Sequence, residues 1–331
     1  MRTANFKSAA IAALLSMGLL TGCTNGITNQ KTSNHMDTLN LTQEWDKKFP
    51  QSNKVNHRKV TFKNRYGITL AADLYEPKNI ESKVPAIAVS GPFGAVKEQS
   101  SGLYAQTMAE RGFLTLAFDP SYTGESGGEP RNVASPDINT EDFSAAVDFL
   151  IAHPNVDAKR IGIIGICGFG GMGLNAAAMD TRIKATVAST MYDMSRVNAN
   201  GYFDAEDSAE VRRNKREAMN AIRTRDAQNG TATPGTPGLP TSIKGDEPQF
   251  VKDYFDYYKT ERAFHARAIN SNGAWNPTMA LSFINMPLLT YIHEIDNAVL
   301  LIHGENAHSR YFSEDAFKRL KGNNKELLIV P

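Results

Sequence analysis

Short apolar runs alternate with helical patterns along most of the chain, from about residue 55 onward. Residues 57–63 (HRKVTFK) and 68–77 (ITLAADLYEP) alternate apolar with polar positions around a turn at 64–67, which predicts an antiparallel hairpin. Further apolar runs predict strands at AIAVSG, FLTLAFD, RIGIIGI, IKATVAST, AVLLIHG and ELLIV. Because helical patterns separate most of these runs, the fold class expected is α/β, a mostly parallel sheet with helices on both faces.

The helical patterns fall at 102–112, 140–153, 171–180 and 313–322, and the second is expected to begin at the capping residue Thr140. A long connection runs from Met191 to Asn297 and contains a charged helix, a Gly/Pro/Thr loop and an aromatic segment at 249–268. Connections of this length usually carry structure of their own. We therefore predict a helical cap at about 194–297, with most of its aromatic rings packed on the core.

Composition and charge narrow the function. The 331 residues are 41% hydrophobic and 21% charged, which suits one large α/β domain. Lysine plus arginine number 36 against 35 acidic residues, so the formal charge of +1 gives no electrostatic sign of nucleic-acid binding. The seven histidines are scattered and no CxxC occurs. We expect neither a metal site nor a cofactor, and no nucleic-acid partner.

The N-terminus has the pattern of an export signal. Arg2 and Lys7 precede the apolar run AAIAALLSMGLL, and Leu20-Thr21-Gly22-Cys23 follows. This order resembles the lipobox of bacterial lipoproteins, in which the cysteine is lipidated; an ordinary signal peptide is the alternative. The resemblance implies a signal peptide at 1–22, a membrane anchor at Cys23 and a place on the bacterial cell envelope. Residues 23–40 are polar and aperiodic, as in a tether, and the folded domain is expected at 41–331.

Cys167 lies where a strand is predicted to turn sharply into a helix. The chain has two cysteines, so if Cys23 carries lipid, Cys167 has no disulfide partner and is a free thiol. The stretch Gly165–Gly171 reads GICGFGG, and its glycines give room for a strained turn that presents a side chain above the sheet. The N-terminus of the next helix favours a thiolate. Cys167 is therefore a candidate nucleophile, with an inert core cysteine as the alternative.

Strand, GICGFGG turn and helix together resemble the α/β-hydrolase superfamily, in particular the dienelactone-hydrolase-like branch in which cysteine replaces serine in G-x-S-x-G. The sequence departs from the motif at Phe169, where glycine is usual. The resemblance implies an oxyanion hole from the N–H of Gly168 and an N–H in the loop after AIAVSG, at Phe93 or Gly94. A Gly/Pro-rich loop that only turns the chain is the alternative interpretation of 91–94.

The acid and the base of a triad are harder to place. Glu305 follows AVLLIHG and Asp193 follows IKATVAST; Glu314 and Asp315 are further candidates, and each also suits a helix cap or a solvated charge. The resemblance implies a histidine after the last strand, but Pro331 already stands there, whereas His303 and His308 precede that strand. We expect the sequence to be cut short before the loop that carries the histidine and before the final helix. We therefore expect the polypeptide as written to have little catalytic activity.

The function expected is hydrolysis of an ester, thioester or lactone, with Cys167 attacking the carbonyl. A non-catalytic envelope protein that keeps the fold as a binding module is the alternative. Two other features lie near the candidate site in the sequence. Residues 121–128 are expected to form a structural turn at the rim of the site, and Lys97 and Glu98 either pair to brace the oxyanion loop or begin a solvated helix.

Overall fold

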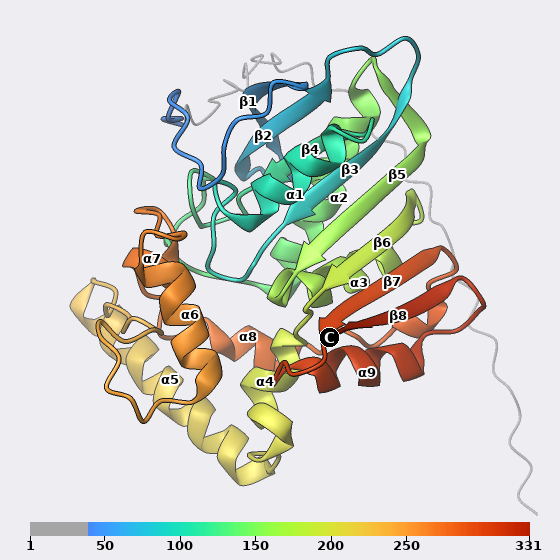
Figure 1. Ribbon diagram of the computed structural model, residues 1–331. Helices are drawn as coiled ribbons and strands as arrows, with labels where there is room; N and C mark the ends of the chain where they lie inside the picture. The colour runs from blue at the N-terminus through green and yellow to red at the C-terminus, as the bar shows by residue number, and fades with distance from the viewer. Residues whose placement is uncertain (1–38) are drawn as a thin grey trace, which may run out of the picture. The chain divides into compact units, whose positions relative to one another are not determined.

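A computed structural model of the protein describes residues 39–331 (Figure 1). The predicted signal peptide, the lipid site at Cys23 and most of the predicted tether lie outside these residues. Within them, one sheet has the strand order β1-β2-β4-β3-β5-β6-β7-β8. Its strands are β1 (Val55–Lys63), β2 (Thr69–Pro77), β3 (Val84–Ser90), β4 (Leu114–Phe118), β5 (Val156–Ile166), β6 (Ile183–Ser189), β7 (Ala298–Gly304) and β8 (Lys325–Val330).

Nine α-helices and two short 3₁₀ helices connect the strands within the described residues. They are α1 (Ser100–Ala109), α2 (Pro136–Ala152), α3 (Gly168–Met179), α4 (Met194–Asn200), η1 (Tyr202–Asp204), α5 (Ala209–Asn229), α6 (Gln249–Lys259), α7 (Ile269–Asn272), α8 (Ala280–Asn285), η2 (Ile292–Glu294) and α9 (Arg310–Arg319). None of the helices in this part of the chain is both long and apolar enough to span a membrane.

The pairing of the strands confirms the predicted fold class. β1 and β2 form the expected antiparallel hairpin, and β2 also runs antiparallel to β4. The other pairs, β3–β4, β3–β5, β5–β6, β6–β7 and β7–β8, are all parallel. Parallel strands joined by helices place their carboxyl ends at one edge of the sheet, where functional side chains of such folds gather.

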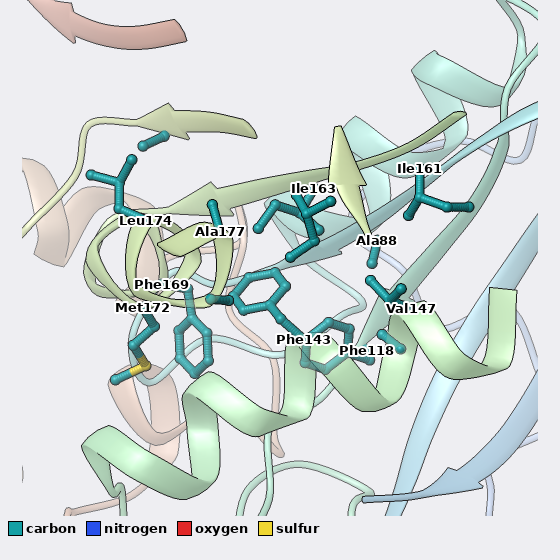
Figure 2. Packing of buried hydrophobic residues seen from close by; sticks show 14 of the residues in the cluster. Ala88, Phe118, Phe143, Val147, Ile161, Ile163, Phe169, Met172, Leu174 and Ala177 are labelled. Carbon is teal, nitrogen blue, oxygen red and sulfur yellow. The ribbon is translucent and has the colours of Figure 1, made fainter. Parts of the chain in front are cut away.

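Alternation along the strands gives the sheet two apolar faces. In β5, Ile161 and Ile163 face the core shared with α2, α3 and α9, whereas Ile164 and Ile166 face the core shared with α1. Figure 2 shows the first of these cores, with the ring of Phe143 between α2 and α3. Buried on both faces, β5 is a rigid support for the residue that follows it.

The helix predicted to begin at Thr140 begins earlier in the structure. α2 begins at Pro136 rather than at Thr140, because Ser135 caps it by accepting a hydrogen bond from the N–H of Ile138 at 3.4 Å, and proline suits the first helical position. Thr140 lies inside the helix and donates to the carbonyl of Pro136 at 2.6 Å. The aromatic segment 249–268 is helical only as far as Lys259.

The long connection between β6 and β7 contains α4 to α8 with both 3₁₀ helices, and α5, α6 and α7 lie together beyond the strand ends (Figure 1). α5 is the predicted charged helix, and Met219 is its one buried side chain. We call residues 190–297 the cap.

The first described residues are fastened to the domain. The N–H of Thr42 donates to Glu125 at 2.7 Å, and Asp46 pairs with Arg267 of the cap at 2.7 Å. Lys47, also buried, lies 3.0 Å from Asp73 of β2. The segment 42–49 is therefore packed against the sheet and the cap.

Candidate active site

Cys167 joins β5 to α3 with a backbone that non-glycine residues rarely adopt. Its φ is +57° and its ψ is −125°. Hydrogen bonds hold this conformation: its N–H donates to the carbonyl of Ser189 at 2.9 Å, and its carbonyl accepts from Gly170 at 2.8 Å and Tyr192 at 3.0 Å. Strain held in this way is characteristic of functional positions, and here it puts the thiol at the carboxyl edge of the sheet.

The glycines around Cys167 allow a close approach of backbones. A Cβ on Gly165 would lie 2.1 Å from the carbonyl oxygen of Phe169, and one on Gly171 would lie 2.4 Å from that of Tyr192. Phe169, the departure from the usual motif, turns its ring into the core, where it lies 6.3 Å from the ring of Phe143. Gly91 gives Phe169 room, because a Cβ on Gly91 would lie 2.9 Å from Cβ of Phe169.

The thiol of Cys167 lies against two backbone amides. Burial raises its pKa, and hydrogen bonds from the N–H groups of Phe93 and Gly168 oppose that rise. The structure thus brings together three of the residues singled out in the sequence. The expected thiolate is not favoured overall, because the loss of hydration outweighs the two amides and the helix N-terminus.

Gly94 occupies a different place from Phe93. Its φ is +82°, a conformation that suits glycine, and its carbonyl accepts a hydrogen bond from the N–H of Asn270 at 3.0 Å. A Cβ on Gly94 would lie only 2.4 Å from Oδ1 of Asn270. Of the two candidate donors in this loop, Phe93 is the one whose N–H lowers the pKa of the Cys167 thiol.

A cavity of about 610 Å³ opens over Cys167, between the sheet edge and the cap. Aromatic side chains form much of its wall: Phe93, Tyr192, Tyr202, Phe250, Tyr254, Tyr258 and Trp275. The ring of Phe93 stacks on Trp275 with centroids 4.3 Å apart, and Phe250 stacks on His308 at 4.1 Å. The volume and lining are those of a site for a small organic molecule.

Hydrogen bonds connect three polar side chains of the cavity, Tyr192, Tyr254 and His308. Tyr192 Oη lies 3.0 Å from Tyr254 Oη and 2.5 Å from Nε2 of His308. Burial lowers the pKa of His308, although Asp253 opposes this, so the neutral imidazole is favoured at pH 7. Asp253 lies at the exposed rim, where Gln249 Nε2 donates to it at 2.8 Å.

The candidate acids lie away from the cavity lining. Glu305 is exposed, and Asp193 caps α4 by accepting from the N–H groups of Ser195 and Arg196, both at 3.0 Å. Glu314 pairs with Arg310 at 3.0 Å and Asp315 with Arg196 at 2.9 Å. Each of them has a structural partner or faces solvent, and the structure brings none of the four to Cys167.

The other histidine near the strand ends is occupied. His303 is fully buried in β7, with Nδ1 2.7 Å from Ser313 Oγ and Nε2 3.0 Å from Ser309 Oγ. Burial lowers its pKa to about 4, with smaller contributions from His308 and Arg310. It is a neutral core histidine. No cluster of three or more potential metal ligands occurs in the part of the chain that the structure describes.

The loop between β3 and α1, residues 91–99, carries the oxyanion-hole candidates, and we call it the oxyanion loop. Behind it lies a largely buried group of charges that we call the ion cluster: Lys59, Lys97, Glu98, Asp119, Glu125 and Arg267. Lys97 Nζ lies 2.8 Å from both Glu98 and Asp119 and 2.6 Å from Glu125. Burial lowers the pKa of Lys97, but attraction to Asp119 and Glu98 outweighs it, so the pKa is raised and the ammonium is retained. Lys97 and Glu98 therefore pair and brace the loop.

Sequence reasoning did not single out Tyr192, Tyr254, Asn270 or Trp275, all of which line the cavity. The aromatic segment that contains Tyr254 was noticed, but a stripe of rings has the same pattern whether it packs on a core or walls a cavity. Tyr192 precedes the candidate acid Asp193 and, like it, follows the strand IKATVAST, so its position in the sequence already placed it near the strand ends.

Comparison with known proteins places this architecture among hydrolases. The model of the family described as X-Pro dipeptidyl-peptidase (S15 family) matches residues 66–331. The chain is 60% identical over 337 residues to the uncharacterized protein PA2218 of Pseudomonas aeruginosa, covering 100% of this chain and 90% of that protein. The crystal structure of that hypothetical protein superposes with a TM-score of 0.85 at 64% identity, covering 88% of this chain and 91% of the other.

More distant relatives carry further names. The uncharacterized protein YcjY of Escherichia coli K12 is 34% identical over 286 residues, covering 83% of this chain and 90% of that protein. The thiohydrolase aneE of Aspergillus aculeatus is 33% identical over 132 residues, 40% of this chain and 41% of that one. The α/β hydrolase GrgF of Penicillium sp. sh18 shares the fold, with a TM-score of 0.67 at 21% identity over 83% of this chain and 89% of that one.

Proposed function

Because the chain belongs to the X-Pro dipeptidyl-peptidase (S15) family, we propose that it hydrolyses ester, thioester or lactone bonds with Cys167 as the nucleophile. The fold is that of the α/β hydrolases, and the family and its relatives indicate an enzyme of that kind. One observation carries the choice of nucleophile: the sulfur of Cys167 lies at the floor of the cavity against the N–H groups of Phe93 and Gly168.

The reaction follows from this arrangement. A base removes the thiol proton, and the sulfur attacks the substrate carbonyl carbon to form a C–S bond while the carbonyl oxygen becomes an oxyanion. The N–H groups of Phe93 and Gly168 stabilise that oxyanion. The intermediate collapses by breaking the C–O or C–S bond to the leaving group, which takes up the proton. Water then hydrolyses the acyl thioester on Cys167 and restores the thiol.

A general base is required because burial keeps Cys167 protonated at neutral pH. His308 lies in the cavity, but its ring stacks on Phe250 and its Nε2 lies within hydrogen-bond distance of Tyr192 Oη. We assign His308 to the wall of the cavity, and the His308→Gln variant described below tests that assignment.

The lining of the cavity favours a substrate whose acyl group carries no charge. Its wall is aromatic, and Asp253 at the rim is its only acidic residue. An X-Pro dipeptide carries an α-ammonium that would have to be desolvated and paired. Asp253 is exposed and already accepts from Gln249, so it is a poor partner for that group. An ester or thioester of a neutral acid fits the wall better than a dipeptide.

The decisive experiment asks whether Cys167 is acylated. The full-length protein, Cys167→Ala and Cys167→Ser are incubated with short p-nitrophenyl esters and acyl thioesters. We expect p-nitrophenol release and a mass increase equal to the acyl group on a peptide containing Cys167, and a loss of about a thousandfold or more in the alanine variant. Circular dichroism provides the control for folding.

Other outcomes would overturn the proposal. Full activity of Cys167→Ala would reject the nucleophile. Cleavage of glycyl-prolyl p-nitroanilide in preference to the esters would make the enzyme a peptidase. Binding of esters without acylation of the full-length protein would favour the alternative, a non-catalytic binding module. A His308→Gln variant tests the base: a thousandfold loss of kcat with unchanged KM would assign that role to His308.

We also propose that the enzyme is a lipoprotein of the bacterial envelope, anchored through Cys23. The order of charge, apolar run, small residues and cysteine supports this assignment. Metabolic labelling with a palmitate analogue is expected to mark the wild-type protein and not Cys23→Ser, which should then leave the membrane fraction. Equal labelling of the two would contradict the anchor.

A further inference from the structure

The cap holds the oxyanion loop in place, and Asn270 is the central contact. Asn270 Nδ2 donates to the carbonyl of Phe93 at 2.8 Å, while its backbone N–H donates to the carbonyl of Gly94 at 3.0 Å. Asn270 thus binds two successive residues of the loop with a side chain and a backbone group. It belongs to α7, about 100 residues after Cys167 along the chain.

Other cap residues reinforce this contact. The ring of Trp275 stacks on that of Phe93, and Phe283 meets it edge-on at 6.1 Å. Further along the loop, Gln99 Nε2 donates to the carbonyl of Ala263 at 2.6 Å, and Arg267 lies 2.9 Å from Glu98. Cap residues between 263 and 283 therefore contact both ends of the loop from Phe93 to Gln99.

These contacts determine where the N–H of Phe93 points. Within one residue, the N–H and the carbonyl are related only by rotation about φ and ψ. Because Asn270 holds the carbonyl of Phe93 and Trp275 holds its ring, the backbone nitrogen of Phe93 has little freedom to move. Phe93 is thereby kept beside the turn at Cys167, where its Cβ would lie 2.9 Å from a Cβ on Gly168. Gly94 has no space for a Cβ against Asn270, so the two residues fit closely.

We propose that Asn270 is a positioning residue that aligns the Phe93 N–H and makes the oxyanion hole depend on the cap. The inference rests on the proposed function, since it concerns the same nucleophile. It implies that the hole is complete only while the segment 263–283 is seated on the loop. A displaced cap would leave Cys167 in place but without one of its two donors.

The test compares Asn270→Ala and Asn270→Asp with Asn272→Ala in the same helix. Asn272 is a matched control because its side chain is exposed and reaches only the carbonyl of Ala266, at 3.5 Å. On a short p-nitrophenyl ester, we expect kcat to fall about tenfold to a hundredfold in both Asn270 variants, with KM changed less than threefold, since one oxyanion donor is misplaced. Asn272→Ala should behave as wild type.

A second measurement reports on the sulfur directly. The pH dependence of Cys167 alkylation by iodoacetamide follows the fraction of thiolate. Because the Phe93 N–H lowers the pKa of Cys167, loss of that contact should move the alkylation midpoint to higher pH in both Asn270 variants. A residue that only supports folding would lower the melting temperature without moving this midpoint.

The outcomes separate the two proposals. Retained activity and unchanged labelling in Cys167→Ala would reject the nucleophile itself. An essential Cys167 combined with Asn270 variants that match Asn272→Ala in kcat and alkylation midpoint would reject only the positioning role. A rise in KM with constant kcat would assign Asn270 to substrate binding and likewise reject the proposal.

Discussion

Two polar regions lie on either side of the oxyanion loop, and they handle charge in opposite ways. The cavity over Cys167 holds hydroxyl groups, a neutral imidazole and aromatic rings. The ion cluster behind the loop holds lysines, an arginine and carboxylates, and most of these groups are buried. Phe93 faces the first region, whereas Lys97 and Glu98 belong to the second.

The difference shows how buried charges can hold a short loop that also borders a cavity whose acidic residue, Asp253, lies at the exposed rim. Ion pairs at the far end of the loop fix its backbone: the N–H of Lys97 donates to Asp119 at 2.8 Å while its ammonium binds the same carboxylate. At the near end, the dipoles of two N–H groups face the sulfur with no full charge to compete with them. A developing oxyanion gains most from fixed dipoles in such surroundings.

The largest effect is expected from removing the central cation of the ion cluster. Lys97→Met leaves Glu98, Asp119 and Glu125 without their shared partner in a buried place, so the free energy of unfolding should fall by about 3 to 5 kcal/mol. Urea denaturation measures it. Lys318→Met is the control, because Lys318 pairs with Asp315 in solvent and its loss should leave the free energy of unfolding nearly unchanged. Similar values for the two variants would mean that the ion cluster carries no special weight.

Acid should weaken the ion cluster in a defined pH range. Burial raises the pKa of Glu125, but Lys97 and Lys59 outweigh it and lower the pKa to about 2 from 4.5. A carboxyl whose pKa is depressed by folding stabilises the protein fully above its unfolded pKa, and that contribution is lost as the pH falls from about 4.5 toward 2.

Urea unfolding between pH 7 and pH 2 measures this loss. His303 adds a separate loss of stability as the pH falls from its unfolded pKa of 6.5 toward its folded value of about 4. The loss arises because the buried ring must stay neutral in the folded protein, whereas the unfolded chain takes up a proton. Glu125→Gln should lose less stability below pH 4.5 than the wild type does and should leave the upper part of the profile unchanged. Glu98, whose pKa is also lowered, still contributes to the loss in that variant. A loss below pH 4.5 as large as in the wild type would contradict the assignment.

The smallest effect is expected in the cavity. Tyr192→Phe removes the hydroxyl between Tyr254 and His308 and should lower kcat/KM by about threefold to tenfold, a change typical of one neutral hydrogen bond. Steady-state kinetics on the preferred ester measures it. Tyr311→Phe is the matched control: its hydroxyl accepts from the N–H of Phe203 outside the cavity, and activity should be unchanged. A thousandfold loss in Tyr192→Phe would instead make its hydroxyl a proton donor in the reaction.

The sequence predicted what local patterns can encode. Apolar runs identified the strands and their mostly parallel order, and GICGFGG located the strained turn at Cys167, because strand, turn and helix follow one another along the chain. The resemblance to the α/β hydrolases, and not the local pattern, pointed to Gly168 and to Phe93 or Gly94. The start of α2 was missed by four residues because Ser135 and Pro136 were not weighed as an alternative cap.

Long-range contacts could not be predicted in this way. Lys97 and Glu98 suited a buried brace or a solvated helix equally well until Lys59, Asp119 and Arg267, from distant segments, were brought to them. For the same reason Glu305 and Asp193 were reasonable acids by position in the strand order, although their side chains point to solvent and to a helix cap. Asn270 gave no local signal at all.

The attachment of residues 42–49 determines how the domain would bear mechanical load. A pull on the chain from upstream of Leu39 would reach Thr42, Asp46 and Lys47 first, and through them Glu125, Arg267 and Asp73. Force would therefore pass into the buried charges and the β-sheet. If the protein is anchored to a membrane through its N-terminus, a pull on that anchor would first load the contacts of residues 42–49 with the cap and with β2. The turn that carries Cys167 would be loaded later.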